Sequence, residues 1–509
     1  MLSLWATAVL AYILWRTYKV ATALQTYKRI PKYYCVADPI TALAGLIIPR
    51  GWWNPGFSIT WNGKETLYTV RSSEVVLVVP VFFGDALLMT SSPEVCKEIL
   101  NDPTRWSKPE RIMGLDVMGK NVIASNPPVW RTHRKIAAPA FDDQAFSDVW
   151  EVITTAYNQM MASPDWKSTD VHYVPAFNNI TTRIALLAIV KCGFNIPMEW
   201  NQDQDDKSGS FDEIAVTLPN SSLRHIAAAS EALQRILREK IITKKKELSL
   251  ELELDGAVSK ANKNLFGRFV AASQREGDRG LDASEIMGNL FVFLLAGHDT
   301  TAHSMVLTLA LLAGQPEDQE RVHRHIKSVI GDADPTYDDY SSLAPVQHCL
   351  YEAIRLFPAG WITMRLSGMD EVWSAPQLTP TGEDVVVQKG TTVMVDFIGA
   401  CRNPRHFPSP HDFVPLRWAP SNDPDAPPPP SMDTFLGFSS GPRTCLGKKF
   451  ASVEAVCFLT LLLRDWKVGV KLAPGESMQA WRKRVLQPEL STALKTGDVP
   501  LLLTRRLKR

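Results

Sequence analysis

The sequence predicts a mainly α-helical fold with a smaller β subdomain, and two stretches of the chain carry that prediction. Residues Thr66–Phe83 are dense in Val, Thr, Tyr and Phe, which indicates two strands of a hairpin-like sheet. A long helix is expected from the acidic capping box Asp282-Ala283-Ser284-Glu285 to Gly314, with Pro316 just beyond. At about 1.5 Å per residue this helix is roughly 45 Å long, enough to cross a whole domain. We therefore expect it to be the central helix of the fold.

Composition restricts the class of protein. The 509 residues are 45% hydrophobic and 21% charged, which is typical of a globular protein with a large core and excludes a disordered chain. A net charge of +1 supplies no global field for polyanions, so we expect no nucleic-acid partner. Seven scattered cysteines without a CxxC pair argue against a disulfide framework or a zinc ribbon and favour a reducing compartment.

The N-terminus predicts a membrane anchor. Leu2–Trp15 is uncharged and apolar, and five cations follow it: Arg16, Lys19, Lys28, Arg29 and Lys32. Because cations next to a membrane span stay on the cytosolic side, we expect these five residues to lie there. The run is short for a span, but Arg16 and Lys19 can snorkel and extend it towards Leu24. A cleaved signal peptide is the alternative, with Ala21-Thr22-Ala23 in its favour and the missing basic n-region against it.

These features predict three regions: an anchor over residues 1–30, a membrane-proximal linker over 31–60 and one large domain over 61–509, for which the motifs below indicate a catalytic role. An apolar, aromatic patch formed by Ile40–Ile48 and Trp52-Trp53 is expected to dip into the membrane interface. Late in the chain, Asn403–Pro430 is rich in Pro and Asp and is expected to be an irregular, packed meander.

The most informative segment is Phe438–Gly447, a glycine-bracketed loop that presents one cysteine at the start of an apolar helix. Backbone N–H groups at a helix N-terminus and the cation of Arg443 stabilise negative sulfur, which favours Cys445 as a thiolate metal ligand. Gly441 and Gly447 leave room for a flat cofactor close to the backbone. For an isolated cysteine the alternative is a buried structural residue.

The pattern FxxGxRxCxG resembles the haem-binding loop of the cytochrome P450 family of haem-thiolate monooxygenases. Further motifs follow in the family's order: WxxxR at Trp130, the oxygen-activation motif at Ala296–Thr301, ExxR at Glu352 and FxPxRW at Phe413. The resemblance covers about residues 50–509. It implies the cytochrome P450 fold, with the long central helix over the haem, and haem b as the cofactor.

The resemblance also implies roles for individual residues. Cys445 is the expected iron ligand, in a loop that includes Phe438, Gly441 and Gly447. The expected ligands of the haem propionates are Trp130, Arg134, Arg365 and Arg443, since Arg pairs with carboxylates and Trp offers an indole N–H. Glu352, Arg355 and Arg417 are the expected buried triad beneath the haem.

Asp299 and Thr300 are the expected proton relay, an acid beside a hydroxyl at a helix position loosened by Gly297. An own-helix hydrogen bond for Thr300 and a simple ion pair for Asp299 are the alternatives. Two departures from the family pattern are Leu416, where the family usually has Glu, and a poorly matched proline hinge after the anchor.

The implied function is insertion of one atom of O2 into an apolar substrate, at the cytosolic face of the endoplasmic reticulum membrane, by a monomeric catalytic unit. Electrons would come from NADPH through a diflavin reductase, with a cytochrome b-type protein as a further donor. A haem-thiolate isomerase or dehydratase without O2 activation is one alternative, and Asp299 with Thr300 counts against it. A haem-binding carrier or sensor without turnover is another.

The substrate is expected to be a terpenoid or another compact specialised metabolite, as in the fungal microsomal members that the chain resembles. Apolar residues in the stretches that line the family's pocket carry this expectation: Trp106, Ile112, Met113, Leu115, Met118, Ile214, Val216, Leu218 and the roof Phe291–Leu295. A fatty acid is the nearest rival, with Arg111 or Arg224 holding its carboxylate.

Overall fold

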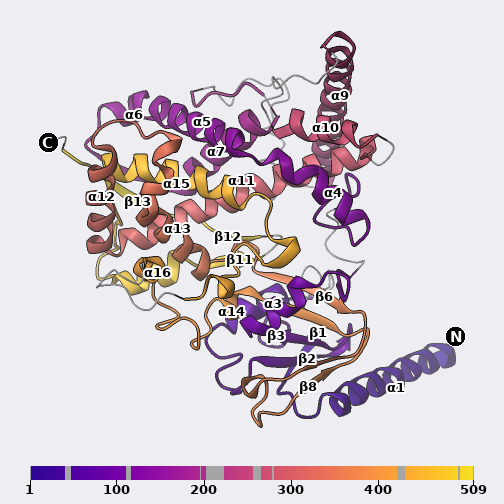
Figure 1. The fold of residues 1–509 in the computed structure, drawn as a ribbon. Helices are drawn as coiled ribbons and strands as arrows, with labels where there is room; N and C mark the ends of the chain where they lie inside the picture. Colours follow the sequence, from indigo (N-terminus) through magenta and orange to yellow (C-terminus); the bar gives the residue numbers. More distant parts are fainter. Residues whose placement is uncertain are drawn as a thin grey trace. The chain divides into compact units, whose positions relative to one another are not determined.

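The computed structural model describes residues 2–39, 48–109, 116–194, 196–201, 223–255, 265–277, 280–420, 430–490 and 493–507. The chain divides into two compact units, and Figure 1 shows their elements. One, here called the sheet-rich unit, comprises residues 1–110, 351–445 and 488–495. The other, the helix-rich unit, comprises 111–350, 446–487 and 496–509.

A mixed sheet of six strands, in the order β1-β2-β3-β9-β6-β4, organises the sheet-rich unit. The strands are β1 (Lys32–Ala37), β2 (Val75–Phe83), β3 (Leu87–Thr90), β4 (Trp106–Ser107), β6 (Ile362–Ser367) and β9 (Thr392–Asp396). A hairpin, β7 (Glu371–Trp373) with β8 (Val385–Val387), and the short strand β11 (Pro488–Leu490) complete the unit's strands. Its helices are α1 (Leu2–Thr26), α2 (Ile59–Asn62), α3 (Pro93–Asn101) and α14 (Phe397–Ala400).

The hairpin expected within Thr66–Phe83 is only partly correct. Residues 66–72 form turns, and β2 finds its antiparallel partner in β3, with Val75 opposite Thr90 and Val78 opposite Leu87. The residues of β2 alternate between two apolar clusters, so both faces of this strand are buried. That double burial explains its near-continuous valine run.

Helix α11 (Ala283–Ala313) is the long central helix of the helix-rich unit, as predicted. Its N-cap Asp282 accepts from the Glu285 N–H at 2.8 Å, while the Glu285 carboxylate accepts from the Asp282 N–H at 3.2 Å. Gly314 is the C-cap, and Pro316 begins the next helix. The predicted capping box and helix end are therefore confirmed.

The remaining helices of this unit pack against α11, which contacts α7, α9, α12 and α15, or against one another (Figure 1). They are α4 (Val129–Ala137), α5 (Asp143–Ala162), α6 (Pro164–Lys167), α7 (Phe177–Ala188), α9 (Leu223–Asp255), α10 (Leu265–Arg275), α12 (Pro316–Ile330), α15 (Lys448–Asp465) and α16 (Met478–Val485). Strands β10 (Trp466–Gly469), β13 (Leu501–Arg505) and β5 (Val171–Val174) form a small antiparallel sheet. Helix α13 (Ala344–Leu356) and strand β12 (Leu494–Thr496) include residues of both units.

The predicted anchor forms helix α1, which continues through Arg16 and Lys19. Tyr27 and Ile30, at the end of the predicted anchor region, belong to the core cluster of the sheet-rich unit. Strand β1 of the predicted linker pairs with β2. Of the described helices, α11 is the one that length and composition would allow to cross a membrane, but 67% of its apolar window is buried, as in the core helix of a soluble domain.

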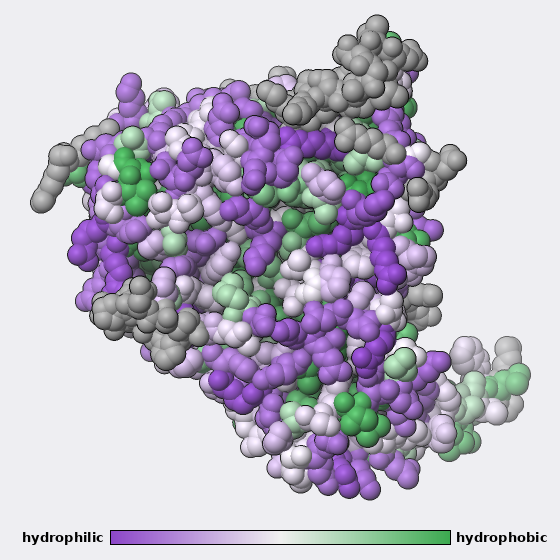
Figure 2. Space-filling view, in the orientation of Figure 1, coloured by the Kyte–Doolittle hydropathy of each residue, from purple (hydrophilic) through white to green (hydrophobic). Residues whose placement is uncertain are grey.

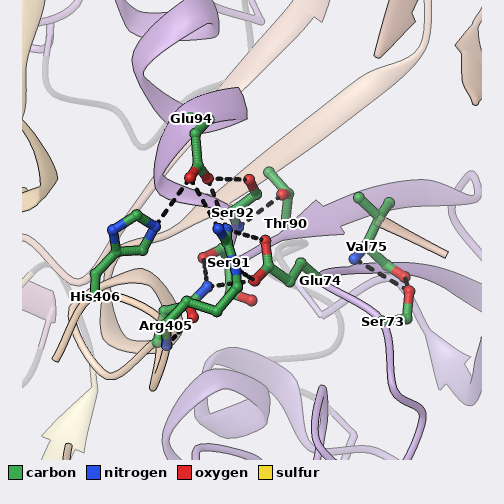
Figure 3. A network of polar contacts seen from close by, with 10 residues as sticks. Ser73, Glu74, Val75, Thr90, Ser91, Ser92, Glu94, Arg405 and His406 are labelled. Atoms are coloured by element: carbon green, nitrogen blue, oxygen red, sulfur yellow. Dashed lines mark hydrogen bonds and ion pairs between the residues drawn. The ribbon is translucent and has the colours of Figure 1, made fainter. Parts of the chain in front are cut away.

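A polar network ties the start of the predicted meander to the sheet (Figure 3). Arg405 donates to the Glu74 carboxylate at 2.6 and 2.8 Å and to the Glu94 carboxylate at 2.8 and 3.0 Å. The His406 ring lies 3.0 Å from Glu94, and the Asn403 amide donates to Glu74 at 2.7 Å. The Arg405 guanidinium thus joins Glu74, which directly precedes β2, to Glu94, which lies in the first turn of α3.

Candidate functional site

The Cys445 loop is folded back on itself in the sheet-rich unit. The Cys445 N–H donates to the Phe438 carbonyl at 2.9 Å, and the Thr444 N–H donates to the Gly441 carbonyl at 3.0 Å. Among the cysteines, all of which lie in described residues, Cys445 is exposed and the other six are buried. The loop therefore presents this thiol rather than packing it into the core.

Gly441 is required by a close approach to helix α3. Its φ is +67°, and a Cβ at this position would lie 2.5 Å from Asn101 Oδ1 and 2.7 Å from the Leu100 carbonyl oxygen. Gly447, the N-cap of α15, is different, because a Cβ there would meet no described atom within 4 Å. The space beside Gly447 is consistent with room for a cofactor next to the backbone.

Three cations gather near this loop within the sheet-rich unit. Arg365 is buried, its Nη1 donates to the Met364 carbonyl at 2.7 Å, and its Nε has no hydrogen-bond acceptor among the described residues. Burial, followed by the charge of Arg443, lowers the pKa of Arg365 to about 9. Burial and the charges of Arg365 and Arg443 likewise hold the pKa of Lys108 well below its usual value. An anion placed beside these side chains would favour the charged forms of Arg365 and Lys108.

Glu352 is the centre of a buried network. It accepts from Arg355 at 2.8 and 2.9 Å and from Arg417 Nε at 2.9 Å, and all three side chains are buried. The Val414 N–H and the Trp418 indole N–H add bonds of 3.0 and 2.9 Å. The structure thus brings the predicted triad together and shows two further donors that sequence reasoning missed.

Arg355 also binds backbone carbonyls in and next to the meander, Asn403–Pro430. Its guanidinium donates to the backbone carbonyls of Cys401, Pro410 and Asp412 at 2.7–2.9 Å and stacks over the Phe407 ring at 5.2 Å. Carbonyls from an irregular segment are thereby satisfied by one buried side chain. This explains how a segment without regular structure is held in place.

An aromatic cluster links the same helix to the cysteine loop. The Tyr351 ring stacks on Phe435 at 5.3 Å and meets Phe438 edge-on at 6.2 Å. Trp418, which also bonds Glu352, packs against Phe435 at 4.9 Å. Phe438 therefore packs the start of the Cys445 loop against the ExxR helix.

Trp130 and Arg134 lie one turn apart on α4 in the helix-rich unit. The buried His133 between them lies 2.8 Å, through Nδ1, from the amide nitrogen of Asn289 on α11. Asn289 also accepts from the Val122 N–H at 2.9 Å. His133 and Asn289, which the sequence did not single out, thus connect α4 to the central helix.

The polar residues in α11 bond largely within their own helix. Thr300 Oγ1 donates to the Ala296 carbonyl at 2.8 Å, and Thr301 Oγ1 donates to the Gly297 carbonyl at 3.0 Å. The alternative weighed for Thr300, an own-helix hydrogen bond, is therefore present. Asp299 lies 3.9 Å from His303 Nε2, one turn along. A Cβ on Gly297 would lie 3.2 Å from Ile189, which occupies the notch that this glycine leaves.

The family model described as Cytochrome P450 matches residues 81–495 of the chain. The chain belongs to the cytochrome P450 family. It is similar to Cytochrome P450 monooxygenase 124 of Postia placenta, with 28% identity over 476 residues that cover 88% of each chain. It is also similar to Cytochrome P450 4X1 of Homo sapiens, with 26% identity over 413 residues, 76% of this chain and 78% of the relative.

Solved structures have the same cytochrome P450 fold. The cytochrome P450DA heme domain matches with a TM-score of 0.71 at 20% identity, covering 94% of this chain and 98% of that chain. A zebra fish cytochrome P450 solved with progesterone matches with a TM-score of 0.66 at 19% identity, covering 88% and 98%. The predicted fold class is therefore confirmed.

A cytochrome P450 is an oxidoreductase that binds haem b through a cysteine thiolate and works with a redox-partner reductase, a substrate and O2. The residues of the sheet-rich unit fit that group. Cys445 offers an exposed thiol, and the cations of Arg365, Arg443 and Lys108 could pair with the haem propionates. Lys108 was missed because an isolated lysine in a sequence carries no signal of burial.

The expected substrate contacts are mostly outside the described residues, namely Arg111, Ile112, Met113, Leu115, Ile214, Val216, Leu218 and the side chain of Arg224. Trp106 is described, and its expected place in the pocket is wrong. Its ring is fully buried in the sheet-rich core and stacks on Trp373 at 5.9 Å, because β4 pairs with β6. Met118, Val122 and Val292–Leu294 are buried in the helix-rich unit.

Proposed function

We propose that this cytochrome P450 inserts one atom of O2 into an apolar small molecule, with Cys445 as the axial iron ligand and NADPH electrons delivered by a diflavin reductase. The observation that carries the proposal is the exposure of Cys445, in a loop beside a cluster of three cations of which Arg365 is buried. Burial raises the pKa of the Cys35 thiol to about 12 and that of Cys401 to about 11, which keeps these thiols protonated and unsuited to metal binding. Cys445 is the thiol that a cofactor can reach.

In the sheet-rich unit, Arg365, Arg443 and Lys108 would hold the cofactor by its propionates. The same role for Trp130 and Arg134 on α4 stays a prediction from the family resemblance. When bound, haem supplies the binding and reductive activation of O2. The triad Glu352–Arg355–Arg417 positions the meander and, through Trp418 and Phe435, the cysteine loop.

Asp299 and Thr300 are proposed to deliver protons during turnover. The Asp299 side chain is 18% exposed, so water can reach it. In this proposal Thr300 Oγ1 accepts a proton from the Asp299 side and releases its own hydroxyl proton, so the hydrogen bond that this hydroxyl donates to the Ala296 carbonyl at 2.8 Å breaks during the relay. The presence of both Asp299 and Thr300 supports O2 activation over isomerase or dehydratase chemistry, because those reactions need no proton delivery to O2.

The proposed substrate is a terpenoid or a similarly compact lipophile. Support comes from the apolar stretch Phe291–Leu295 on α11 and from the buried Met118 and Val122. Burial of each CH2 group of a hydrocarbon skeleton contributes about 0.8 kcal/mol to binding. Titration of the ferric enzyme with terpenoid and fatty-acid panels tests this choice. A tight spectral response to fatty acids alone, lost in Arg111→Ala or Arg224→Ala, would replace it with a fatty-acid hydroxylase.

We further propose that α1 anchors the enzyme to the endoplasmic reticulum membrane, with the catalytic residues in the cytosol. The apolar side chains of α1 are exposed from Leu4 to Trp15, and Trp52, from the predicted interfacial patch, is exposed as well. Residues 40–47 of that patch lie outside the described residues.

The axial ligand is tested by Cys445→Ser. We expect this variant to lose the thiolate-type carbon monoxide difference spectrum of the reduced protein. Cys401→Ser, a matched change at a buried cysteine of the same unit, should retain it in the folded fraction. A normal spectrum from Cys445→Ser would overturn the assignment.

A further inference from the structure

His303 on helix α11 is a buried histidine one turn from the proposed proton relay. Hydrophilic residues predominate on the face drawn in Figure 2 outside the grey atoms, whereas the His303 residue is only 7% exposed. It follows Asp299 by four residues, so the two side chains lie on one face of the helix. A buried polar ring needs hydrogen-bond partners, and the surroundings of its two nitrogens therefore decide what the ring does.

One ring nitrogen, Nδ1, faces Thr496 at the end of strand β12. The Thr496 N–H donates to His303 Nδ1 at 3.4 Å, and the Thr496 hydroxyl, which can also donate, lies 3.4 Å away as well. A backbone N–H can only donate, so Nδ1 is the acceptor in this contact. The hydrogen of the neutral ring is therefore assigned to Nε2, because the hydrogen bond at one ring nitrogen sets the tautomer at the other.

The other ring nitrogen, Nε2, lies 3.9 Å from Asp299 Oδ1. This distance is longer than a hydrogen bond, so the Nε2–H attracts the carboxylate without locking it in place. A neutral donor also lacks the full positive charge of a lysine or arginine, which would oppose proton uptake by the acid. The His303 ring is thus suited to orient an acid that has to gain and lose protons.

We propose that His303 is a positioning residue, whose Nε2–H restrains the Asp299 carboxylate in the orientation that the proton relay uses. Thr496 fixes the tautomer of the ring, and His303 keeps its own proton throughout. The inference rests on the proposed relay from Asp299 to Thr300. A carboxylate side chain has several rotamers, and a fixed donor one turn along the helix favours some of them. The relay needs this restriction, because a proton passes only between groups held within hydrogen-bond reach.

Two amide variants of the full-length holoenzyme separate the two contacts of the ring. The His303→Asn side chain reaches only as far as Nδ1, so it can accept from the Thr496 N–H but no longer contacts Asp299. The His303→Gln side chain reaches as far as Nε2, so it can donate to Asp299 but loses the contact with Thr496. Product, peroxide and NADPH consumption are measured with a diflavin reductase and whichever compound of the terpenoid and fatty-acid panels gives the strongest spectral response. Enzyme amounts are matched by the carbon monoxide difference spectrum.

We expect His303→Asn to form roughly five- to ten-fold less product per NADPH while peroxide rises, the scale of one lost contact to a charged group. His303→Gln should stay close to wild type. The opposite order, with His303→Gln impaired and His303→Asn normal, would show that the ring acts only through its link to β12 and would overturn the inference.

Asp299→Asn separates failure of this inference from failure of the relay. If Asp299 delivers protons, Asp299→Asn lowers product per NADPH, and His303→Asn added to it should lower that ratio no further. Unchanged coupling in Asp299→Asn would overturn the relay and the inference with it. Loss of coupling in Asp299→Asn but not in His303→Asn would overturn the inference alone.

The tautomer supplies a readout that does not depend on turnover. Nitrogen-15 NMR of the histidine-labelled holoenzyme, reduced and bound to carbon monoxide, reports which ring nitrogens carry hydrogen, and either His303 variant identifies the signals of this ring. We expect a hydrogen on Nε2 and none on Nδ1 at neutral pH. A hydrogen on Nδ1, alone or in a doubly protonated ring, would overturn the inference.

Discussion

At the scale of single residues, the buried charge of Arg365 is expected to contribute to haem affinity and not to the stability of the apoprotein. Arg365 is buried beside Arg443, and both burial and this neighbour disfavour its charge. The protein without haem therefore keeps a cation where its own fold does not favour one. A haem propionate beside Arg365 would offset the free-energy cost of its buried charge. The cluster should therefore contribute to haem affinity.

We expect Arg365→Gln to release haem about ten-fold faster, a loss of roughly 1.4 kcal/mol that is typical of one hydrogen bond to a charged group. The apoprotein should lose no stability. Haem transfer to an acceptor protein and thermal unfolding of the apoprotein measure the two effects. Arg402 is the matched control, since it is buried in the same unit and burial lowers its pKa to about 9 as well. Arg402→Gln should destabilise the fold without changing haem transfer, and the reverse pattern would refute the cluster's role.

Thr300 allows a second prediction at this scale. Its hydroxyl bonds a carbonyl of its own helix, so Thr300→Ala should leave α11 folded. Loss of the proton relay should lower product formed per NADPH by roughly 10- to 100-fold while peroxide rises. Oxygen uptake, peroxide and product are measured together, with Thr300→Ser expected to restore coupling. Unchanged coupling in Thr300→Ala would move the relay elsewhere, with Thr301 the next candidate.

At the scale of elements, Glu352 joins helix α13 to the meander. It is the acceptor for two buried arginines, Arg355 and Arg417, so its loss would leave their charges without an ionic partner. Glu352→Gln is expected to cost about 3–5 kcal/mol, a large part of a typical folding free energy. The yield of haem-loaded protein and thermal unfolding measure it. The exposed Glu317→Gln on α12 is the control, and equal stability of the two variants would refute the argument.

The Arg405 network makes a pH-dependent prediction. Partial burial raises the pKa of Glu94, but hydrogen bonds from Arg405 and other donors outweigh burial and lower that pKa from 4.5 to about 2. A carboxyl with a depressed folded pKa stabilises the fold fully above its unfolded pKa and loses that contribution as the pH falls through the folded value.

We therefore expect wild type to exceed Arg405→Gln in unfolding free energy by ~1 kcal/mol above about pH 4.5, a modest figure because the network is partly exposed. The difference should shrink as the pH falls towards about 2. Denaturant unfolding at several pH values measures it. A difference that stays constant over this range would show that Glu94 does not supply the stabilisation.

At the scale of the whole molecule, the position of the anchor's end decides which truncations keep the fold. Deletion of residues 2–15 should release much of the protein from membranes, with residual binding through Trp52 and the rest of the predicted interfacial patch, and should leave haem incorporation intact. Deletion of residues 2–30 removes Tyr27 and Ile30 from the core and should cost several kcal/mol, by analogy with large-to-small core changes of about 2–5 kcal/mol each. Membrane fractionation and the haem spectrum compare the two. Equal folding of both truncations would show that residues 16–30 are dispensable.

Local signals in the sequence were sufficient for the features that depend on neighbouring residues. The capping box at Asp282 and the stop at Gly314 define α11, because both act through bonds within one turn of the helix. The glycine-bracketed loop and the order of the family's motifs pointed to a cysteine that the structure leaves exposed. The spacing of Glu352 and Arg355 places them on one helix face, where they pair.

Only the tertiary structure decided features that join distant parts of the chain. Strand β3 pairs with β9, some three hundred residues later, and Trp106 is carried into the core by the pairing of β4 with β6. Lys108 joins the cations, and Arg16 reaches the β2 carbonyls, for the same reason. Burial and long-range partners depend on how remote segments pack, and no local propensity or spacing records that packing.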